Sequence, residues 1–351
     1  MFNSKTTFVI GAGASKEAHL PIGSELTGEI AKLVNFHVEG GRELVRGDPQ
    51  IYNVIRTTVQ QGGWEQNTLL ASGRKLAAAM ALAPSIDTFL ETHAGNREYE
   101  FLGKLAIVKA ITMAEGKSLL AARNEGREPF KMGDLSATWY VRFAQQLFSG
   151  IPRDTPEAAF RDITLVIFNY DRCVEIFLIN AISIFFDTSL AKASEIVRSL
   201  NILRPYGCIG SVHQGDTDYT PFGYGSTDLL SAAERIKTYS ESVDSGSVSA
   251  IRESISNAET LIFLGFGFGD QNMDLIAPEI ADFEFELEGR QIFGTAHDVS
   301  ASDVDVIKQN LASMLTGQYP WKPSWMNLYN GTCAELFNHY HRSLTAFRPK
   351  G

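Results

Sequence analysis

The sequence predicts an α/β fold in which a parallel sheet is interrupted by a helical insertion. Continuous apolar runs, of the kind found in strands buried on both faces, alternate with helix-like segments. This alternation favours parallel strands joined by right-handed crossovers. From about residue 35 to residue 156 it gives way to amphipathic helices. We therefore assign residues 1–35 and 158–316 to a Rossmann-like domain, residues 36–157 to the insertion and residues 317–351 to a C-terminal packing or contact segment.

The first strand is predicted at residues 8–10, an apolar run followed at once by Gly11-Ala12-Gly13-Ala14-Ser15. Glycine lets backbone amides approach a phosphate group, so this turn is typical of a nucleotide site. A dinucleotide fingerprint needs a third glycine where Lys16 stands, and a P-loop needs Gly-Lys-Ser/Thr, so the turn matches neither motif. A glycine pair can also serve a strand-to-helix turn by its geometry alone. After a break at residues 20–24, Ser24 is predicted to cap the next helix.

The insertion is predicted to consist of amphipathic helices without strand alternation. Ser85 stands directly before one of them and is a predicted N-cap. The helices are expected at residues 51–59, 69–82, 86–92, 98–114 and 137–148.

Three further strands are predicted after the insertion. Residues 163–168 form an apolar run that ends in Asn169-Tyr170-Asp171 and precedes a helix at 172–186. Residues 260–264 end in Gly265-Phe266-Gly267, and a fourth strand is expected at 291–295, before a closing helix at 302–315. A polar, glycine-rich stretch at 214–226 is a candidate lid or substrate-facing loop.

The strand ends point to a ligand site. Carboxyl ends of parallel strands meet at one edge, and ligands of open α/β sheets bind there. Asn169 and Asp171 at a buried strand's exit are costly unless both find partners. Asp171 could alternatively cap the helix that follows. Two neighbouring glycine-bearing strand ends favour the ligand interpretation.

Composition narrows the function classes. A net charge of −10 argues against non-specific nucleic-acid binding, which needs basic patches. The three cysteines, Cys173, Cys208 and Cys333, form no Cys-x-x-Cys pair, which excludes a four-cysteine zinc site and favours a reducing compartment. No apolar run is long enough to span a bilayer. We expect a cytoplasmic protein with no membrane partner and no metal.

The order of these motifs resembles the sirtuin-like fold. More narrowly, it resembles the bacterial sirtuin-like domains that act as NAD+-consuming effectors in antiphage defence. The resemblance covers about residues 1–35 and 160–310. It implies that Asn169 lies beside the nicotinamide ribose and positions a nucleophilic water. It further implies an NAD+ site at Gly11, Ala12, Gly13, Ser15, Asp171, Gly265, Gly267 and Asp270.

The sequence departs from the family in three respects. Residues 19–24 lack the Phe-Arg pair of protein-deacylating sirtuins, and the four-cysteine zinc module is absent, so deacylation is not expected. Tyr206 before Gly207 holds the place of the family's general-base histidine. Tyrosine, with an ordinary pKa near 10, is a poor base at neutral pH. His213, and His297 beside Asp298, are alternatives, and the base stays open.

The expected function is hydrolysis of the nicotinamide–ribose bond of NAD+, with NAD+ as substrate. The alternatives are a non-catalytic NAD+- or nucleotide-binding protein and an oligomerising interaction subunit. From the resemblance we also expect a homo-oligomer and a separately encoded sensor protein, such as an ATPase or an Argonaute-like protein.

Overall fold

A computed structural model describes residues 2, 4–40, 43–122, 129–223, 228–244, 246–278, 290–316 and 326–345. Its centre is a six-stranded parallel sheet in the order β5-β4-β1-β6-β7-β8. Counted along the chain, these strands stand in the order 3-2-1-4-5-6 of a Rossmann sheet. This confirms the predicted fold class. The strands are β1 (Thr6–Ile10), β4 (Ile163–Ile167), β5 (Asn201–Leu203), β6 (Thr260–Leu264), β7 (Gln291–Thr295) and β8 (Met326–Tyr329).

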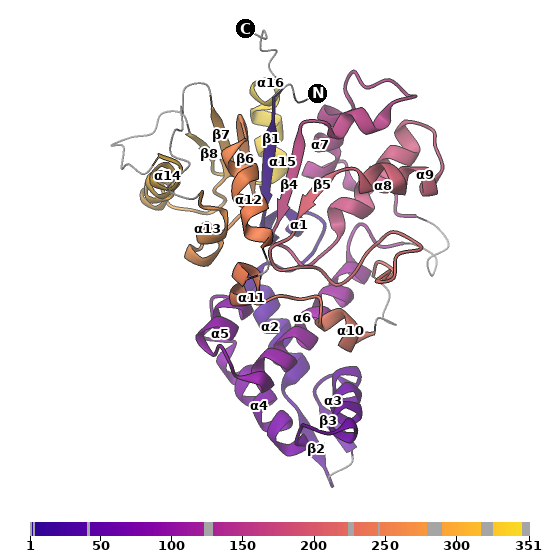
Figure 1. Cartoon of the computed structure of the whole chain (residues 1–351), viewed down its shortest axis with the longest axis vertical. Helices are drawn as coiled ribbons and strands as arrows, with labels where there is room; N and C mark the ends of the chain where they lie inside the picture. Colours follow the sequence, from indigo (N-terminus) through magenta and orange to yellow (C-terminus); the bar gives the residue numbers. More distant parts are fainter. Residues whose placement is uncertain are drawn as a thin grey trace.

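The helical module lies beyond the carboxyl edge of the sheet, where β1 ends (Figure 1). Ser85 caps α5 by accepting a hydrogen bond from the Thr88 amide, as predicted. Ser24 does not cap α2, because that helix already begins at Gly23. The module is built from α2 (Gly23–Val34), α3 (Pro49–Gln61), α4 (Gln66–Ala79), α5 (Ile86–Thr92) and α6 (Arg97–Lys117).

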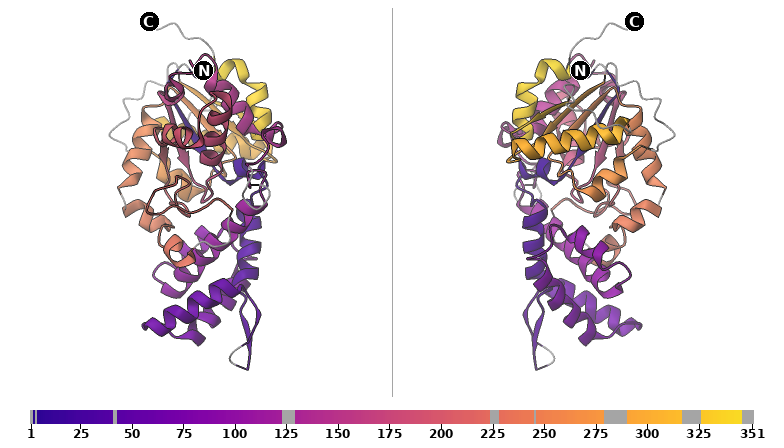
Figure 2. Two further views of the ribbon diagram at one scale, coloured as in Figure 1. Left: turned by 90° about the vertical axis from the view of Figure 1, so that its right-hand side faces the viewer. Right: turned by 90° about the vertical axis from the view of Figure 1, so that its left-hand side faces the viewer.

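Two strands of this module were not predicted. β2 (His37–Glu39) and β3 (Glu43–Arg46) form an antiparallel hairpin that projects from the far end of the module (Figure 2). Its strands are short and largely exposed, so they carry no apolar run for a sequence pattern to reveal.

The predicted insertion, residues 36–157, starts too late and extends too far toward the C-terminus. α2 lies in the range assigned to the Rossmann-like domain but packs against α4 and α6 of the helical module. α7 (Trp139–Phe148) falls within the range assigned to the insertion, but it packs on the sheet. The ring centroid of Phe143 lies 5.1 Å from that of Phe8 in β1. The short 3-10 helix η3 (Pro156–Phe160) likewise contacts β4. The helical module therefore ends before these two elements.

The C-terminal segment belongs to the sheet, which corrects its assignment as a separate packing segment. β8 pairs with β7, and α15 (Cys333–His339) and α16 (His341–Leu344) follow it. Residues 317–325 and 346–351 of that segment lie outside the described residues. β5 was also missed, since it is only three residues long and lies at the sheet edge.

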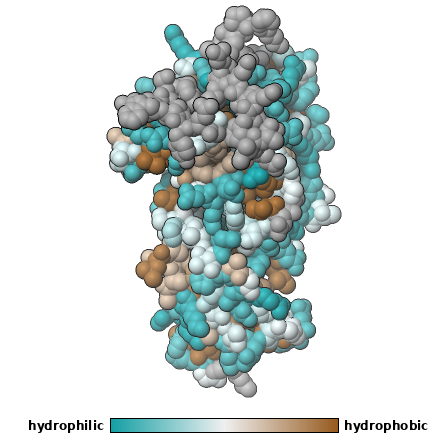
Figure 3. Space-filling model, turned by 60° about the vertical axis from the view of Figure 1, so that its left-hand side comes forward, coloured by the Kyte–Doolittle hydropathy of each residue, from teal (hydrophilic) through white to brown (hydrophobic). Residues whose placement is uncertain are grey.

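Side chains that alternate along the central strands belong to two different hydrophobic cores. Phe8 and Ile10 of β1 join a core with α7, α8 (Cys173–Phe185), α9 (Leu190–Arg198) and α15. Val9 joins the other core, which includes residues of the helical module. The remaining described helices are α1 (Ala12–Lys16), η2 (Met132–Leu135), α10 (Leu229–Ala233), α11 (Tyr239–Asp244), α12 (Ser247–Ser256), α13 (Asp270–Ile276) and α14 (Ala301–Thr316). On the face drawn in Figure 3, hydrophobic residues form small groups separated by hydrophilic ones.

Candidate functional site

The glycine turns after β1 and β6 pack directly against each other. The Gly11 amide donates to the Leu264 carbonyl at 2.9 Å, and the Gly13 amide donates to the Gly265 carbonyl at 3.0 Å. A Cβ on Gly11 would lie 2.5 Å from the Gly265 oxygen. Gly265 has φ +55°, and a Cβ there would lie 2.0 Å from the Ala14 nitrogen. These glycines therefore serve the close approach of two loops, and two of the amides predicted to face phosphate already bond within the chain.

Asn169 is joined to the turn after β1. Its side-chain amide nitrogen Nδ2 donates to the Gly11 carbonyl at 3.1 Å and to Ser15 Oγ at 2.9 Å. Its backbone carbonyl accepts from Arg204 Nη1 at 2.8 Å. Asn169 and Ser15 are both buried. The side-chain oxygen Oδ1 forms no hydrogen bond within the described part of the chain, so it is the acceptor that Asn169 has left for a ligand or a water.

Asp171 takes the structural role that the sequence left open. Its carboxylate accepts a hydrogen bond from the Cys173 amide at 3.1 Å, at the start of α8. The side chain is buried. This contact satisfies a helix amide that lacks a helical acceptor.

A buried ion pair next to this strand end was not found from the sequence. Arg172 Nη2 lies 2.5 Å from Glu115 Oε2, and the Arg172 Nε donates to Glu115 Oε1 at 3.1 Å. Burial raises the pKa of Glu115, while the Arg172 guanidinium opposes this shift. No spacing rule connects a residue of α6 with one that follows β4, so only the tertiary structure reveals the pair.

The same pair holds the candidate lid. Arg172 donates to the carbonyls of Thr220 and Pro221, and the Gly223 amide donates to Glu115 Oε2 at 3.2 Å. The described part of the 214–226 stretch is thereby fastened to both α6 and the end of β4. Its residues 224–226 lie outside the described residues.

Tyr206 is buried and its hydroxyl donates to Asn272 Oδ1 at 2.7 Å. Burial raises the pKa of Tyr206 well above its ordinary value near 10, so its phenol stays protonated at neutral pH. His213 Nδ1 lies 2.6 Å from Ser194 Oγ on α9, and burial lowers its pKa. His297 is mostly exposed and lies 3.6 Å from Asp298. Among the described residues, none of these three side chains forms a hydrogen bond with Asn169.

Aromatic side chains occupy the carboxyl edge between the sheet and the helical module. The Phe168 and Phe266 ring centroids lie 5.1 Å apart, and those of Tyr170 and Tyr206 lie 6.2 Å apart. All four residues are buried. The Tyr170 hydroxyl donates to Asp87 Oδ1 in the first turn of α5. This part of the carboxyl edge is therefore formed by packed aromatic rings.

Gly267 and Asp270 lie farther out. Both residues are exposed, and a Cβ on Gly267 would meet nothing within 4 Å. Asp270 is the first residue of α13. Within the described residues, neither Gly267 nor Asp270 forms a hydrogen bond with Asn169 or Ser15, so the close pair at this turn is Gly13 and Gly265.

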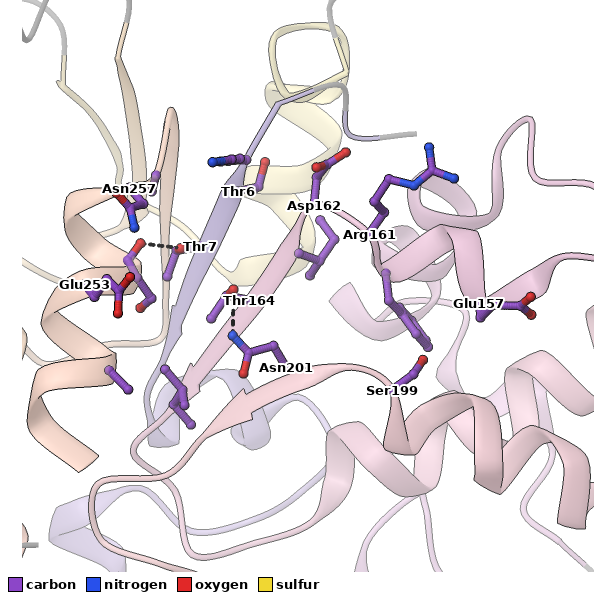
Figure 4. Close-up of a pocket in the computed structure, with 17 residues that line it drawn as sticks. Thr6, Thr7, Glu157, Arg161, Asp162, Thr164, Ser199, Asn201, Glu253 and Asn257 are labelled. Carbon is purple, nitrogen blue, oxygen red and sulfur yellow. Dashed lines mark hydrogen bonds between the residues drawn. The ribbon is translucent and has the colours of Figure 1, made fainter. Parts of the chain in front are cut away.

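A cavity of about 650 Å³ lies at the opposite, amino edge of the sheet (Figure 4). Thr7 and Thr164 line it from β1 and β4, with Asn201 from β5. The Thr7 hydroxyl donates to the Ser254 carbonyl at 2.9 Å, and Asn201 Nδ2 donates to Thr164 Oγ1 at 3.1 Å. The polar groups that line this cavity are thus partly hydrogen-bonded within the protein, and the cavity is separate from the predicted site.

Within the described ranges, no group of three or more histidine, cysteine, aspartate or glutamate side chains is arranged to hold a metal ion. In the same part of the chain, every helix is too short or too polar to cross a bilayer. Comparison with known proteins adds no relative: no family model matches the chain, and a search of curated proteins returned no significant match.

Proposed function

We propose that the carboxyl edge of the sheet binds NAD+ and that the protein hydrolyses its nicotinamide–ribose bond. The observation that carries the proposal is the pair of hydrogen bonds from Asn169 Nδ2 to Gly11 and Ser15. They place a carboxamide at the turn after β1. β1 and β6 are the neighbours at which the strand order reverses, and open α/β sheets bind nucleotides outside that point.

Asn169 would orient the attacking water. Because both hydrogen-bonding contacts of Nδ2 are made within the chain, the direction of Oδ1 is fixed. In the reaction, the bond from ribose C1′ to the nicotinamide nitrogen breaks, and its electron pair leaves with neutral nicotinamide. The water oxygen bonds to C1′ and loses one proton. A carboxamide oxygen that holds this water supplies orientation, which is a large part of such catalysis.

The pyrophosphate contacts are expected at Ala12 rather than at the two glycines. The Gly11 and Gly13 amides donate to the loop after β6. Ala12 is the first residue of α1, and opening amides of a helix lack helical acceptors. NAD+ would therefore use fewer backbone donors here than the resemblance implies.

The test is nicotinamide release from NAD+ by the purified full-length protein, followed by liquid chromatography. Asn169→Ala is expected to lower turnover on the order of 100-fold or more. The matched control is Asn201→Ala, since Asn201 lies at the amino edge and bonds to Thr164. Equal turnover in the wild type and in Asn169→Ala would remove the role given to Asn169.

A second candidate is binding of NAD+ or a related nucleotide without turnover. The buried, protonated Tyr206 in the histidine's place favours it. Calorimetry that measures NAD+ binding while all the NAD+ is recovered intact would support this candidate over the hydrolase.

On the resemblance alone, we also propose a role in antiphage defence, homo-oligomeric assembly and control by a separately encoded sensor protein. An interaction subunit with a vestigial site is the third alternative. Mass photometry of the protein, alone and with the product of a neighbouring gene, tests assembly. A monomer under both conditions would contradict both assembly proposals.

A further inference from the structure

Asp87 brings a carboxylate from the helical module to the end of β4. It lies in the first turn of α5 and accepts a hydrogen bond from the hydroxyl of Tyr170. Tyr170 directly follows Asn169 in the chain. Asp87 is partly exposed, whereas Tyr170 is buried. The hydrogen bond therefore holds the carboxylate to the residue that follows Asn169, and the carboxylate is still partly accessible.

The groups around Asp87 are phenols and acids. Asp87 interacts with Tyr170 and Tyr206 of the strand-end loops. These two phenols interact in turn with Glu91 of α5 and with Tyr239 and Glu241 of α11. Lys104 of α6 pairs with Glu241 at 2.8 Å and with Glu100 at 3.1 Å. Within the described residues, no lysine or arginine forms an ion pair with Asp87.

An unpaired, half-buried carboxylate has the properties of a general base. Burial raises the pKa of Asp87 above its ordinary value of 3.8, while the hydrogen bond from Tyr170 lowers it. A general base is most effective when its pKa lies near the pH at which the enzyme works. A carboxylate can accept at both of its oxygens, so Asp87 can still accept a proton while it holds the hydrogen bond from Tyr170.

We infer that Asp87 is the general base of the site, in place of the histidine that Tyr206 replaces. The inference rests on the proposed NAD+ hydrolysis. As the C1′–nitrogen bond breaks and water bonds to C1′, the Asp87 carboxylate takes the proton that the water loses. It later releases this proton to solvent, so the overall products are ADP-ribose, nicotinamide and one proton.

The first experiment compares Asp87→Asn with the wild type. Asparagine keeps an oxygen that can accept from Tyr170 but cannot take up a proton. We expect kcat to fall on the order of 100-fold, with the Kd for NAD+ by calorimetry essentially unchanged. Asp303→Asn, in the first turn of α14, is the matched control and should leave both values unchanged. Circular dichroism and the Tm verify that each variant is folded.

The outcomes separate this inference from the function on which it rests. If the wild type releases nicotinamide and Asn169→Ala does not, but Asp87→Asn equals the wild type, the inference is overturned and the hydrolase stands. If the wild type releases no nicotinamide, both are overturned.

A pH profile distinguishes a base from a merely structural residue. Wild-type kcat/KM should fall on the acid side as Asp87 becomes protonated. Tyr170→Phe removes a hydrogen bond that lowers the pKa of Asp87, so this acid limb should move to higher pH. A structural role would lower activity at every pH without moving the limb, and that result would overturn the assignment.

Discussion

Glu115 and Arg172 form an ion pair whose side chains are 0% and 1% exposed. Glu115 lies near the end of α6, and Arg172 directly follows the Asn-Tyr-Asp sequence after β4. The pair therefore connects the helical module to the strand end that carries Asn169. It also holds the loop at Thr220 and Pro221 through backbone carbonyls.

Glu115→Gln should destabilise the protein by about 3 kcal/mol, because it leaves the Arg172 guanidinium buried without its counter-charge. Urea unfolding followed by tryptophan fluorescence measures the change. Glu195→Gln is the control, since its partner Lys192 and Glu195 itself are both largely exposed, and little change is expected. Equal midpoints for the two variants would contradict the importance of the buried pair.

Gly265→Ala should destabilise the protein by on the order of several kcal/mol, because an alanine there would combine a left-handed backbone with overpacking. The new Cβ would lie 2.0 Å from the Ala14 nitrogen at a φ of +55°. Gly267→Ala, two residues on, has open space and should change stability little. Thermal unfolding of the pair is the measurement. If both variants melted alike, the packing of the two glycine turns would not matter for stability.

Tyr206→Phe should keep NAD+ turnover within about tenfold of the wild type, because a phenol that stays protonated is not the base. The variant loses the hydrogen bond to Asn272 and about 1 kcal/mol of stability. Steady-state kinetics and urea unfolding report the two effects separately. A loss of turnover on the order of 100-fold, with the fold intact, would reinstate Tyr206 as a catalytic residue.

Stability should depend on pH through Asp87. Its pKa is raised in the folded protein, so between its ordinary value of 3.8 and that raised value the folded state binds more protons than the unfolded state. Stability from this group is consequently greatest at low pH and is lost as the pH rises through the folded pKa. Asp87→Asn cannot titrate, so its stability relative to the wild type should increase from about pH 4 to about pH 7. Urea unfolding at both pH values tests this, and an unchanged difference would show that the pKa is not raised.

The sequence predicted the elements that carry long apolar runs. β1, β4, β6 and β7 each have five residues, most of them buried, and the polar Asn169 follows such a run. β5 and β8 have three and four residues, and their pairing depends on neighbours far away in the chain. α7 has a helical pattern that was recognised, but no local signal shows that Phe143 packs on Phe8 rather than on the helical module.

The site was predicted less completely, because residue type does not reveal what a residue faces. Gly13 and Gly265 signalled a close approach, yet the approaching group is the other loop. The sequence indicated that Asp171 needs a hydrogen-bond partner and left two interpretations, a ligand contact or a helix cap. The bond from the Cys173 amide at the start of α8 corresponds to the second. Asp87 resembles an ordinary acidic residue in a helix's first turn, and only the contact with Tyr170 distinguishes it.

The central place of β1 has a consequence for how the protein is made. The strand is synthesised long before the strands that pair with it, residues 163–167 and 260–264. Such distant pairing slows folding and leaves a strand edge open to aggregation. A nascent chain halted before residue 260 would have one side of β1 unpaired, and it is at this stage of synthesis that we expect chaperones to bind.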